Sequence, residues 1–390
     1  MNFDFDNIVN RKGTHSMKWD GMQVFYETND LLPMWVADMD FKSPICVREL
    51  FADTVEHGVF GYNILENDLR ESIVSWLKRR HGWDIEKDWI GFTPGVVAAL
   101  AIAIQFLTDE GDGVVIQSPV YHPFYHVINE NGRKLITNPL KIVEDRYYFD
   151  LEDLEEKIKA HSPKMLILCN PHNPGGRVWE RDELIELGDL CQRYGVQVVS
   201  DEIHCDLTLP GVKHSSFGML GTESSRNSIV AMAASKTFNV AGLGFSFVIV
   251  PDKSMRDKYI KKIESLQIGH GSTFGVLATL KAFDEGEAWL AELINYIDTN
   301  YKYLADFFAK HLPEVRVMKP DASFLVWLDF NEYGLSEVEL QNKFIKEAKV
   351  APNFGRMFGK EGRGFVRLNI GCPRATLEQG LNSIAKVFKN

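Results

Sequence analysis

The sequence predicts an α/β protein built on a mostly parallel sheet, followed by a smaller α+β domain. Between residues 113 and 250, apolar and β-branched runs alternate with helical segments, which is the pattern of parallel strands joined by crossover helices. From about residue 252 the chain changes to long helices with few strands. Polar groups follow three of the predicted strands directly, and ligand sites of open α/β sheets lie beyond the carboxyl ends of their strands.

The first 45 residues carry turn signals and are expected to be irregular. An amphipathic helix is predicted over 67–81, because its apolar side chains recur at helical spacing and Gly82 ends it. A second helix begins at Val96, directly after the turn Thr93-Pro94-Gly95. Its first residues are apolar almost without interruption, so we expect it to be buried. The N-terminus of such a helix has free amide groups and a positive dipole end, which suit a phosphate.

Five β-branched or apolar runs predict the strands of the large sheet. They cover residues 113–117, 164–169, 196–200, 228–234 and 244–250. A helix over about 180–194 supplies one crossover. In the C-terminal part, a helix over 287–311, a strand over 324–330, a helix from Ser336 and a strand over 365–370 predict the smaller domain.

Composition and charge narrow the classes of protein to consider. The 390 residues include 43 Lys and Arg against 54 Asp and Glu, a net charge of −11, which argues against a nucleic-acid partner. No apolar run reaches the roughly 18 residues of a membrane span, and the acidic N-terminus does not resemble a signal peptide. The five cysteines form no CxxC pair, so we interpret them as reduced thiols of a cytoplasmic protein.

Three predicted strands end in groups that together suit one cofactor. They are followed by Asp201, by the segment 170–176 that contains Asn173, and by Ser235-Lys236. An aspartate can keep a pyridine nitrogen protonated, an asparagine can donate to a ring oxygen and a lysine can form an imine, which is what pyridoxal phosphate requires. Lys236 alone is also compatible with an exposed lysine just past a strand. The three strand ends together favour a partly desolvated amine with a lowered pKa.

Other candidate residues have two interpretations each. Arg367 lies in the strand over 365–370 and is either a buried ion-pair partner or a clamp for a carboxylate. Tyr121 is either a core aromatic or a ring stacked on a flat cofactor. His122 and His126 have the spacing of metal ligands on a helix, but Pro123 lies between them and no HExxH motif follows, so we predict no metal site.

Six segments, in this order, resemble those of the aspartate-aminotransferase-like, fold-type I pyridoxal phosphate enzymes, and within them the cystathionine β-lyase branch, the MalY/PatB type of C–S lyase. These segments are 35–41 (WVADMDF), 118–124 (SPVYHPF), 169–176 (CNPHNPGG), 200–204 (SDEIH), 235–239 (SKTFN) and 369–374 (NIGCPR). The resemblance implies a seven-stranded, mostly parallel sheet with helices on both faces. It also implies an N-terminal segment over 1–45 that joins the small domain, a large cofactor domain over 46–285 and a small domain over 286–390.

The resemblance further implies a role for each residue around the cofactor ring. Lys236 would form the imine with pyridoxal phosphate and move the Cα proton of the substrate. Asp201 would bind the pyridine nitrogen, Asn173 the 3'-oxygen, and Tyr121 would stack on the ring. His204 stands where the family often has a tyrosine, three residues after the aspartate, and we place it among the cofactor-binding residues.

For the phosphate, the resemblance implies the backbone amides of Gly95 and Val96 together with Ser235. Tyr62 resembles the tyrosine that reaches the phosphate of the neighbouring subunit, which implies a homodimer with shared active sites. The family often has a serine three residues before the lysine and, in the aspartate aminotransferases, an arginine eight residues after it; here these positions are Ala233 and Gly244.

For the substrate, the resemblance implies that Arg367 clamps the α-carboxylate near the backbone of Ala37. Residues 267–274 contain no arginine where aspartate aminotransferases supply one for a second carboxylate, which argues against dicarboxylic substrates.

The implied reaction is the β-elimination of a sulfur amino acid, as in methionine biosynthesis. L-cystathionine and water would give L-homocysteine, pyruvate and ammonia, and L-cysteine or other S-substituted cysteines are further candidate substrates. Two alternatives stay open: an aminotransferase for neutral or aromatic amino acids, and a regulatory protein that keeps the fold without catalysis.

Overall fold

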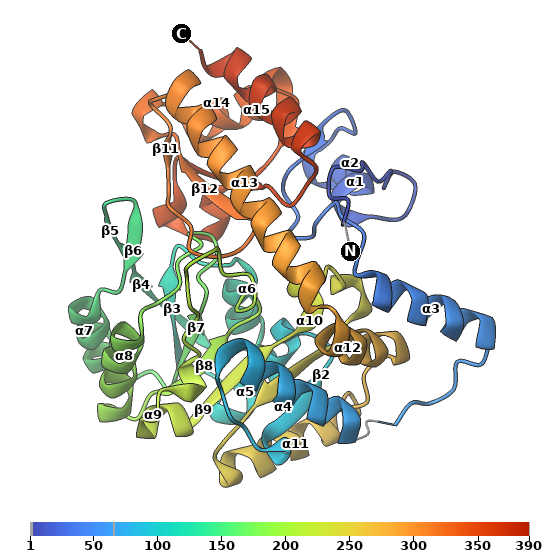
Figure 1. Ribbon diagram of the computed structural model, residues 1–390. Coiled ribbons are helices and arrows are strands. Elements are labelled where there is room, and N and C mark those ends of the chain that lie inside the picture. Colours follow the sequence, from blue (N-terminus) through green and yellow to red (C-terminus); the bar gives the residue numbers. More distant parts are fainter. Residues whose placement is uncertain (1–2, 65–66, 390) are drawn as a thin grey trace.

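The computed structural model describes residues 3–64 and 67–389, so small parts of all three predicted domains, namely residues 1–2, 65–66 and 390, lie outside it. A lower lobe contains the large sheet, and an upper lobe contains the C-terminal elements (Figure 1). The long helix α13 (Glu287–His311) has the bounds predicted from the sequence and runs from one lobe into the other. None of the helices within the described residues has the length and apolar character that a membrane crossing requires.

The large sheet has seven strands in the order β2-β10-β9-β8-β7-β3-β4. Their bounds are β2 Ile90–Thr93, β3 Gly113–Ser118, β4 Lys134–Pro139, β7 Met165–Cys169, β8 Gln197–Asp201, β9 Ser228–Met232 and β10 Ser246–Ile249. The pairs from β9 to β4 are parallel, whereas β10 runs antiparallel to both of its neighbours. The predicted fold class, with its mostly parallel sheet of seven strands, is confirmed.

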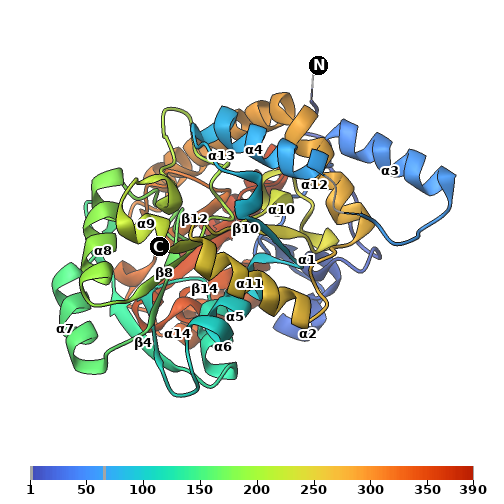
Figure 2. The same ribbon diagram turned by 90° about the horizontal axis from the view of Figure 1, so that it is seen from below.

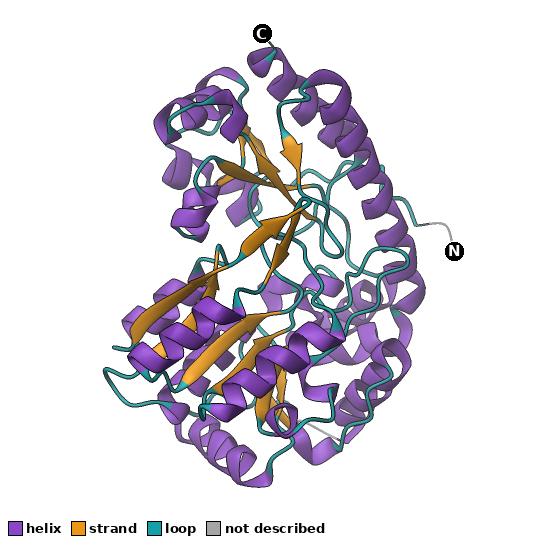
Figure 3. Ribbon diagram, turned by 90° about the vertical axis from the view of Figure 1, so that its left-hand side faces the viewer, coloured by secondary structure: helices purple, strands orange, loops and turns teal. Residues whose placement is uncertain are grey.

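Helices cover both faces of this sheet (Figure 3). The helices described between residues 45 and 285 are α3 Ile45–His57, α4 Asn67–His81, α5 Val96–Leu107, α6 Pro123–Glu130, α7 Leu151–His161, α8 Arg181–Arg193, α9 Glu223–Arg226, α10 Ala234–Thr237, α11 Lys253–Ser265 and α12 Thr273–Glu285. Alternate residues of a strand point to opposite faces, and β7 follows this rule. Met165 and Ile167 pack in the same cluster as α5 and α11, whereas Leu166 and Leu168 pack in the same cluster as α7 and α8.

Two predicted strands of the large sheet are too long. The strand expected over 244–250 covers only Ser246–Ile249. The strand expected over 228–234 ends at Met232. Ala233 remains extended, but it has no partner in the ladder with β10, and the chain enters the helical turn α10 at Ala234. Lys236 therefore lies in a short helix four residues beyond the strand, not at the end of the strand itself.

The upper lobe contains a four-stranded antiparallel sheet and the C-terminal helices. Its elements are β11 Arg316–Val317, β12 Leu325–Asp329, α14 Glu337–Asn342, β13 Val350–Ala351, β14 Asn353–Phe354, β15 Phe365–Asn369 and α15 Arg374–Phe388, with a π-helical turn over Lys343–Glu347. Short 3₁₀ turns lie at Lys87–Trp89, Phe217–Met219, Ala241–Leu243, Asn331–Tyr333, Gly355–Phe358 and Lys360–Gly362, and β5 Lys141–Val143 forms a hairpin with β6 Arg146–Tyr148.

The N-terminal segment contains more structure than the sequence indicated. It forms α1 (Met17–Asp20), α2 (Met22–Tyr26) and β1 (Leu32–Pro33), and β1 pairs in parallel with β13 of the upper lobe. One apolar cluster extends from Met39 through α4 and α13 to Phe388, so the two lobes share a continuous core. The predicted domain boundaries stay a prediction.

Helix α3 projects from the body of the molecule when the protein is seen from below (Figure 2).

Candidate active site

A cavity of about 310 Å³ opens beyond the carboxyl ends of the parallel strands. Most of the site residues predicted from the sequence line it. They are Ala37, Gly95, Val96, Tyr121, Asn173, Asp201, His204, Ser235 and Lys236. The paired register of β7 and β8 sets Cys169 beside Asp201 at the edge of this cavity. The fold therefore brings together the three groups expected from the strand ends, Asn173, Asp201 and Lys236, with Ala37, which is 199 residues from Lys236.

Lys236 is half-buried and presents its amine to the cavity. Its Nζ donates a hydrogen bond of 2.7 Å to the carbonyl oxygen of Ala37. The pKa of Lys236 is lowered to about 8, chiefly by burial and also by the charge of Arg367, and these effects outweigh the carboxylates of Asp38 and Asp201, which raise it. A lysine with such a pKa has a sizeable neutral fraction near physiological pH, so it can act as a nucleophile and as a base.

The loop around Ala37 is held by ion pairs and amide hydrogen bonds. Arg11 binds both carboxylate oxygens of Asp38, at 2.7 and 2.8 Å. The Asn369 amide donates to the carbonyl oxygens of Val36 and Asp38, at 2.6 Å each. These contacts fix the carbonyl oxygen that receives the Lys236 amine.

Asp201 ends β8 as a buried carboxylate. Burial raises the pKa of Asp201 to about 7, although a hydrogen bond of 3.1 Å from the Ile203 amide and the charge of Lys236 lower it. A cationic hydrogen-bond donor placed in the cavity would stabilise this carboxylate. The His204 side chain lies on the turn after the strand, and burial lowers its pKa to about 3, so its imidazole is neutral. Its Nδ1 lies 3.2 Å from the Ser323 hydroxyl.

The N-terminus of α5 faces the same cavity. Gly95 precedes the helix with φ 155° and ψ 156°, a backbone conformation that only glycine adopts readily. Val96, Val97 and Ala98 line the cavity with the first turn of this 12-residue helix, whose amide groups have no partner inside the helix. Ser235 lies nearby on α10. A helix terminus with a neighbouring hydroxyl can bind a phosphate.

Arg367 lies behind the cavity wall, fully buried, and is absent from the lining residues among those described. Its Nη1 donates to Asn173 Oδ1 at 2.8 Å, and its Nη2 donates to Asn353 Oδ1 at 2.5 Å and to the Trp35 carbonyl oxygen at 3.1 Å. Burial lowers the pKa of Arg367 to about 10. These partners are neutral oxygens, so the guanidinium has no carboxylate partner among the described residues, which argues against the structural ion pair and favours a ligand carboxylate.

The two predicted tyrosines differ in environment. Tyr121 lies between β3 and α6 and lines the cavity, and burial raises its pKa. Tyr62 is fully exposed in the segment between α3 and α4 and does not line the cavity. If Tyr62 contacts a cofactor, it therefore does so in the cavity of another copy of the chain.

The structure adds lining residues that sequence reasoning missed. Cys169, Ile203 and Phe245 all line the cavity. Cys169 ends a predicted strand and Ile203 lies two residues after Asp201, so their closeness to the two strand ends was the available signal. Phe245 directly precedes β10, and nothing in its local sequence distinguishes it from the core phenylalanines.

Comparison with known proteins gives concordant results. The family model for aminotransferases of class I and II matches residues 30–384. The cystathionine β-lyase PatB of Bacillus subtilis is 46% identical over 381 residues, and the match covers 98% of each chain. A pyridoxal-phosphate-bound protein of Clostridium difficile 630, described as an aminotransferase, is 41% identical with a TM-score of 0.97, and the match covers both chains fully. A pyridoxal-phosphate-bound C–S lyase of Staphylococcus hominis is 33% identical with a TM-score of 0.93, covering 100% of this chain and 98% of that one.

Proposed function

Because this chain belongs to the family of class I and II aminotransferases, we propose that it is a pyridoxal-phosphate-dependent carbon–sulfur β-lyase. Its reaction converts L-cystathionine and water to L-homocysteine, pyruvate and ammonia, and other S-substituted cysteines are further substrates. The observation that supports the cofactor is the cavity, which is lined by the amine of Lys236, the carboxylate of Asp201 and the N-terminus of α5. The full-length similarity to a cystathionine β-lyase supports this choice of reaction.

The residues of the cavity fit pyridoxal phosphate. The carboxylate of Asp201 accepts one hydrogen bond from the described residues and suits a protonated pyridine nitrogen. Asn173 uses its Oδ1 for Arg367, which leaves its amide hydrogens for the 3'-oxygen. Tyr121 supplies the stacking ring. The amides of Gly95 and Val96 with Ser235 suit the phosphate, and His204 is a neutral neighbour of the ring.

When bound, pyridoxal phosphate supplies an electron-withdrawing ring that takes up the electron pair released at the substrate Cα. The carboxylate of Asp201 would keep the ring nitrogen protonated, which would strengthen this withdrawal. Lys236 removes the Cα proton, because burial lowers the pKa of its amine and so raises the neutral fraction that can act as a base. Arg367 binds the substrate α-carboxylate, and the Ala37 carbonyl oxygen holds the amine of Lys236 beside the substrate. The electron pair then forms the Cα–Cβ double bond as the Cβ–S bond breaks, and the thiolate can leave since thiols have pKa values near 8.5. Hydrolysis of the resulting enamine gives pyruvate and ammonia.

One assay separates this proposal from transamination. The purified protein with pyridoxal phosphate should release pyruvate, ammonia and homocysteine from cystathionine in equal amounts, and Lys236→Ala should release none. Stoichiometric conversion of the cofactor to its amine form, without any free thiol, would instead identify an aminotransferase.

The finer predictions on assembly and location are also part of this proposal. Exposed apolar side chains gather on α3 and the segment after it, namely Val55, Val59, Phe60 and Ile64. Exposed apolar patches of this kind mark interfaces, so a second copy of the chain is the expected partner, with Tyr62 reaching its phosphate. We place the protein in the cytoplasm, because its five cysteines are free thiols.

A further inference from the structure

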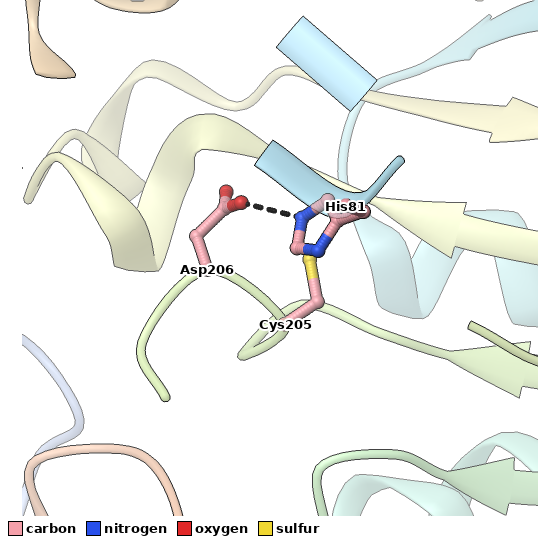
Figure 4. Close-up of side chains that lie close together, drawn as sticks. All are labelled: His81, Cys205 and Asp206. Atoms are coloured by element: carbon pink, nitrogen blue, oxygen red, sulfur yellow. Dashed lines mark hydrogen bonds and ion pairs between the residues drawn. The ribbon is translucent and has the colours of Figure 1, made fainter. Parts of the chain in front are cut away.

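A buried hydrogen-bond network connects the turn that carries His204 with the turn that carries Lys236. At its centre is the carboxylate of Asp206, which is 2% exposed. The Thr237 hydroxyl donates to Asp206 Oδ2 at 2.9 Å. Asp206 Oδ1 accepts from Trp76 Nε1 at 3.1 Å and lies 2.8 Å from His81 Nε2. Figure 4 shows this last contact, with Cys205 beside the imidazole.

These residues could also be considered as a metal site. One ligand atom each of His81, Cys205 and Asp206 lies within 4.8 Å of the others. However, the Trp76 indole nitrogen is only a donor, and its hydrogen occupies the carboxylate oxygen that a cation would need. Burial also raises the pKa of Cys205 well above its ordinary value, which disfavours the thiolate that binds metals. The geometry is that of a hydrogen-bonded carboxylate.

The network joins helix α4, the turn that contains His204 and Asp206, and helix α10, which carries Lys236. Burial raises the pKa of Asp206, but its hydrogen bond to His81 and the charges of His81 and Arg80 outweigh this effect, so the carboxylate is ionised. Its backbone carbonyl oxygen accepts from Arg80 Nη2 at 2.7 Å, which attaches the turn to the last turn of α4. Helix α10 has only four residues, too few for its own hydrogen bonds to fix its position.

A second buried carboxylate, that of Glu202, accepts hydrogen bonds at the end of β8 and fixes the start of the turn that carries His204. Glu202, which follows Asp201, is fully buried and accepts hydrogen bonds from the Ser200 hydroxyl at 2.9 Å and from the Phe217 amide at 2.8 Å. Its Oε2 lies 2.8 Å from His214 Nε2, and the His214 ring contacts the His81 ring with centroids 5.5 Å apart. The two histidine–carboxylate pairs therefore form one continuous network behind the active site.

We propose that Asp206 and Thr237 are positioning residues, which hold the α10 turn and its Lys236 in register with the turn that carries Asp201 and His204. Thr237 is the neighbour of Lys236 in the chain, and its hydroxyl is the direct link from α10 to the network. Loss of this link frees the turn and lets water reach the amine. Only the kinetic readout of this inference rests on the proposed function.

The test compares Thr237→Val with Thr237→Ser and with a matched control, Thr279→Val. Thr279 is equally buried, but its hydroxyl donates to the Gly275 carbonyl oxygen within its own helix, at 2.9 Å. Labelling of Lys236 in the apoprotein with acetic anhydride is followed by mass spectrometry as a function of pH. Thr237→Val should raise the labelling midpoint by about one pH unit, because the amine becomes better hydrated. It should also lower kcat for thiol release about tenfold with little change in KM.

Thr237→Ser restores the hydroxyl and should restore both values, whereas Thr279→Val should change only the melting temperature. Should Thr237→Val be insoluble, Thr237→Ala carries the same prediction. A Thr237 variant that loses stability but keeps the labelling midpoint and kcat of the control overturns the inference. So does a stoichiometric metal in the purified protein, found by elemental analysis. The absence of thiol release from the unaltered protein would contradict the proposed function only, since the labelling experiment is independent of it.

Discussion

At the scale of single residues, burial disfavours the charged forms of Asp201 and Lys236, the two groups that the proposed chemistry uses. Desolvation is the largest cause of the raised pKa of Asp201, about 7, and of the lowered pKa of Lys236, about 8. Each shift means that the folded chain favours the neutral form of the group. Functional sites commonly contain residues that destabilise the fold in this way.

This conflict predicts that Asp201→Asn stabilises the apoprotein at high pH. The folded pKa of Asp201 lies above its ordinary value of 3.8, so below pH 3.8 the group is protonated in both states and has no cost. Stability is then lost as the pH rises from 3.8 to about 7, and the loss is complete above that. At pH 8 the variant should be more stable by a few kcal/mol, on the order of 4 at most. Chemical denaturation at pH 4 and pH 8 checks this, and an equal difference at both values would contradict it.

At the scale of elements, the sequence was most informative where one pattern decided the structure. The long helix expected over 287–311 matches both ends of α13, and β-branched runs located β7 and β8 within a residue. The strands β2 and β4 were missed. β2 is a four-residue edge strand that contains Gly91, and β4 mixes Lys134 and Asn138 into its apolar positions. Pairing with a neighbour, which local sequence does not reveal, is what makes them strands.

The residues of the candidate site that lie at strand ends were also predictable from the sequence. Asp201 ends β8 and Asn173 lies in the turn after β7, so the topology alone brings them together. The contact of Asp206 with Trp76, in contrast, joins residues 130 positions apart through side chains that look like ordinary helix and turn residues. Arg367 lay in a predicted strand, but its neutral partners became visible only in three dimensions.

The start of α5 gives a prediction at this scale. A Cβ on Gly95 would meet no atom within 4 Å, so the only cost of Gly95→Ala is the backbone conformation at φ 155°. That cost is about 1–3 kcal/mol, and relieving it rotates the amides that face the phosphate. We expect the Kd for pyridoxal phosphate to rise about tenfold, measured by titration of the apoprotein. Gly242→Ala, which also has free space but ordinary φ, should leave the Kd unchanged.

At the scale of the whole molecule, Tyr62 is a predicted site residue that does not line the cavity of its own chain. Tyr62 and its exposed apolar neighbours lie on a segment that extends from the body of the protein, between α3 and α4 (Figure 1). An isologous dimer places the same segment of each copy against the other. Such a dimer would cover these side chains and carry each Tyr62 toward the partner's cavity at the same time.

Subunit complementation tests this arrangement directly. Lys236→Ala removes the base, and Tyr62→Ala should weaken phosphate binding, so each variant alone should be inactive or nearly so at limiting pyridoxal phosphate. In a mixed dimer, one cavity receives both substitutions, while the other combines an intact Lys236 with an intact Tyr62 from its partner. Unfolding and refolding an equal mixture should therefore restore about a quarter of the sites of the unaltered protein. Each copy completing its own cavity would instead leave the mixture at the average of its two parents, because every cavity would then keep one of the two defects.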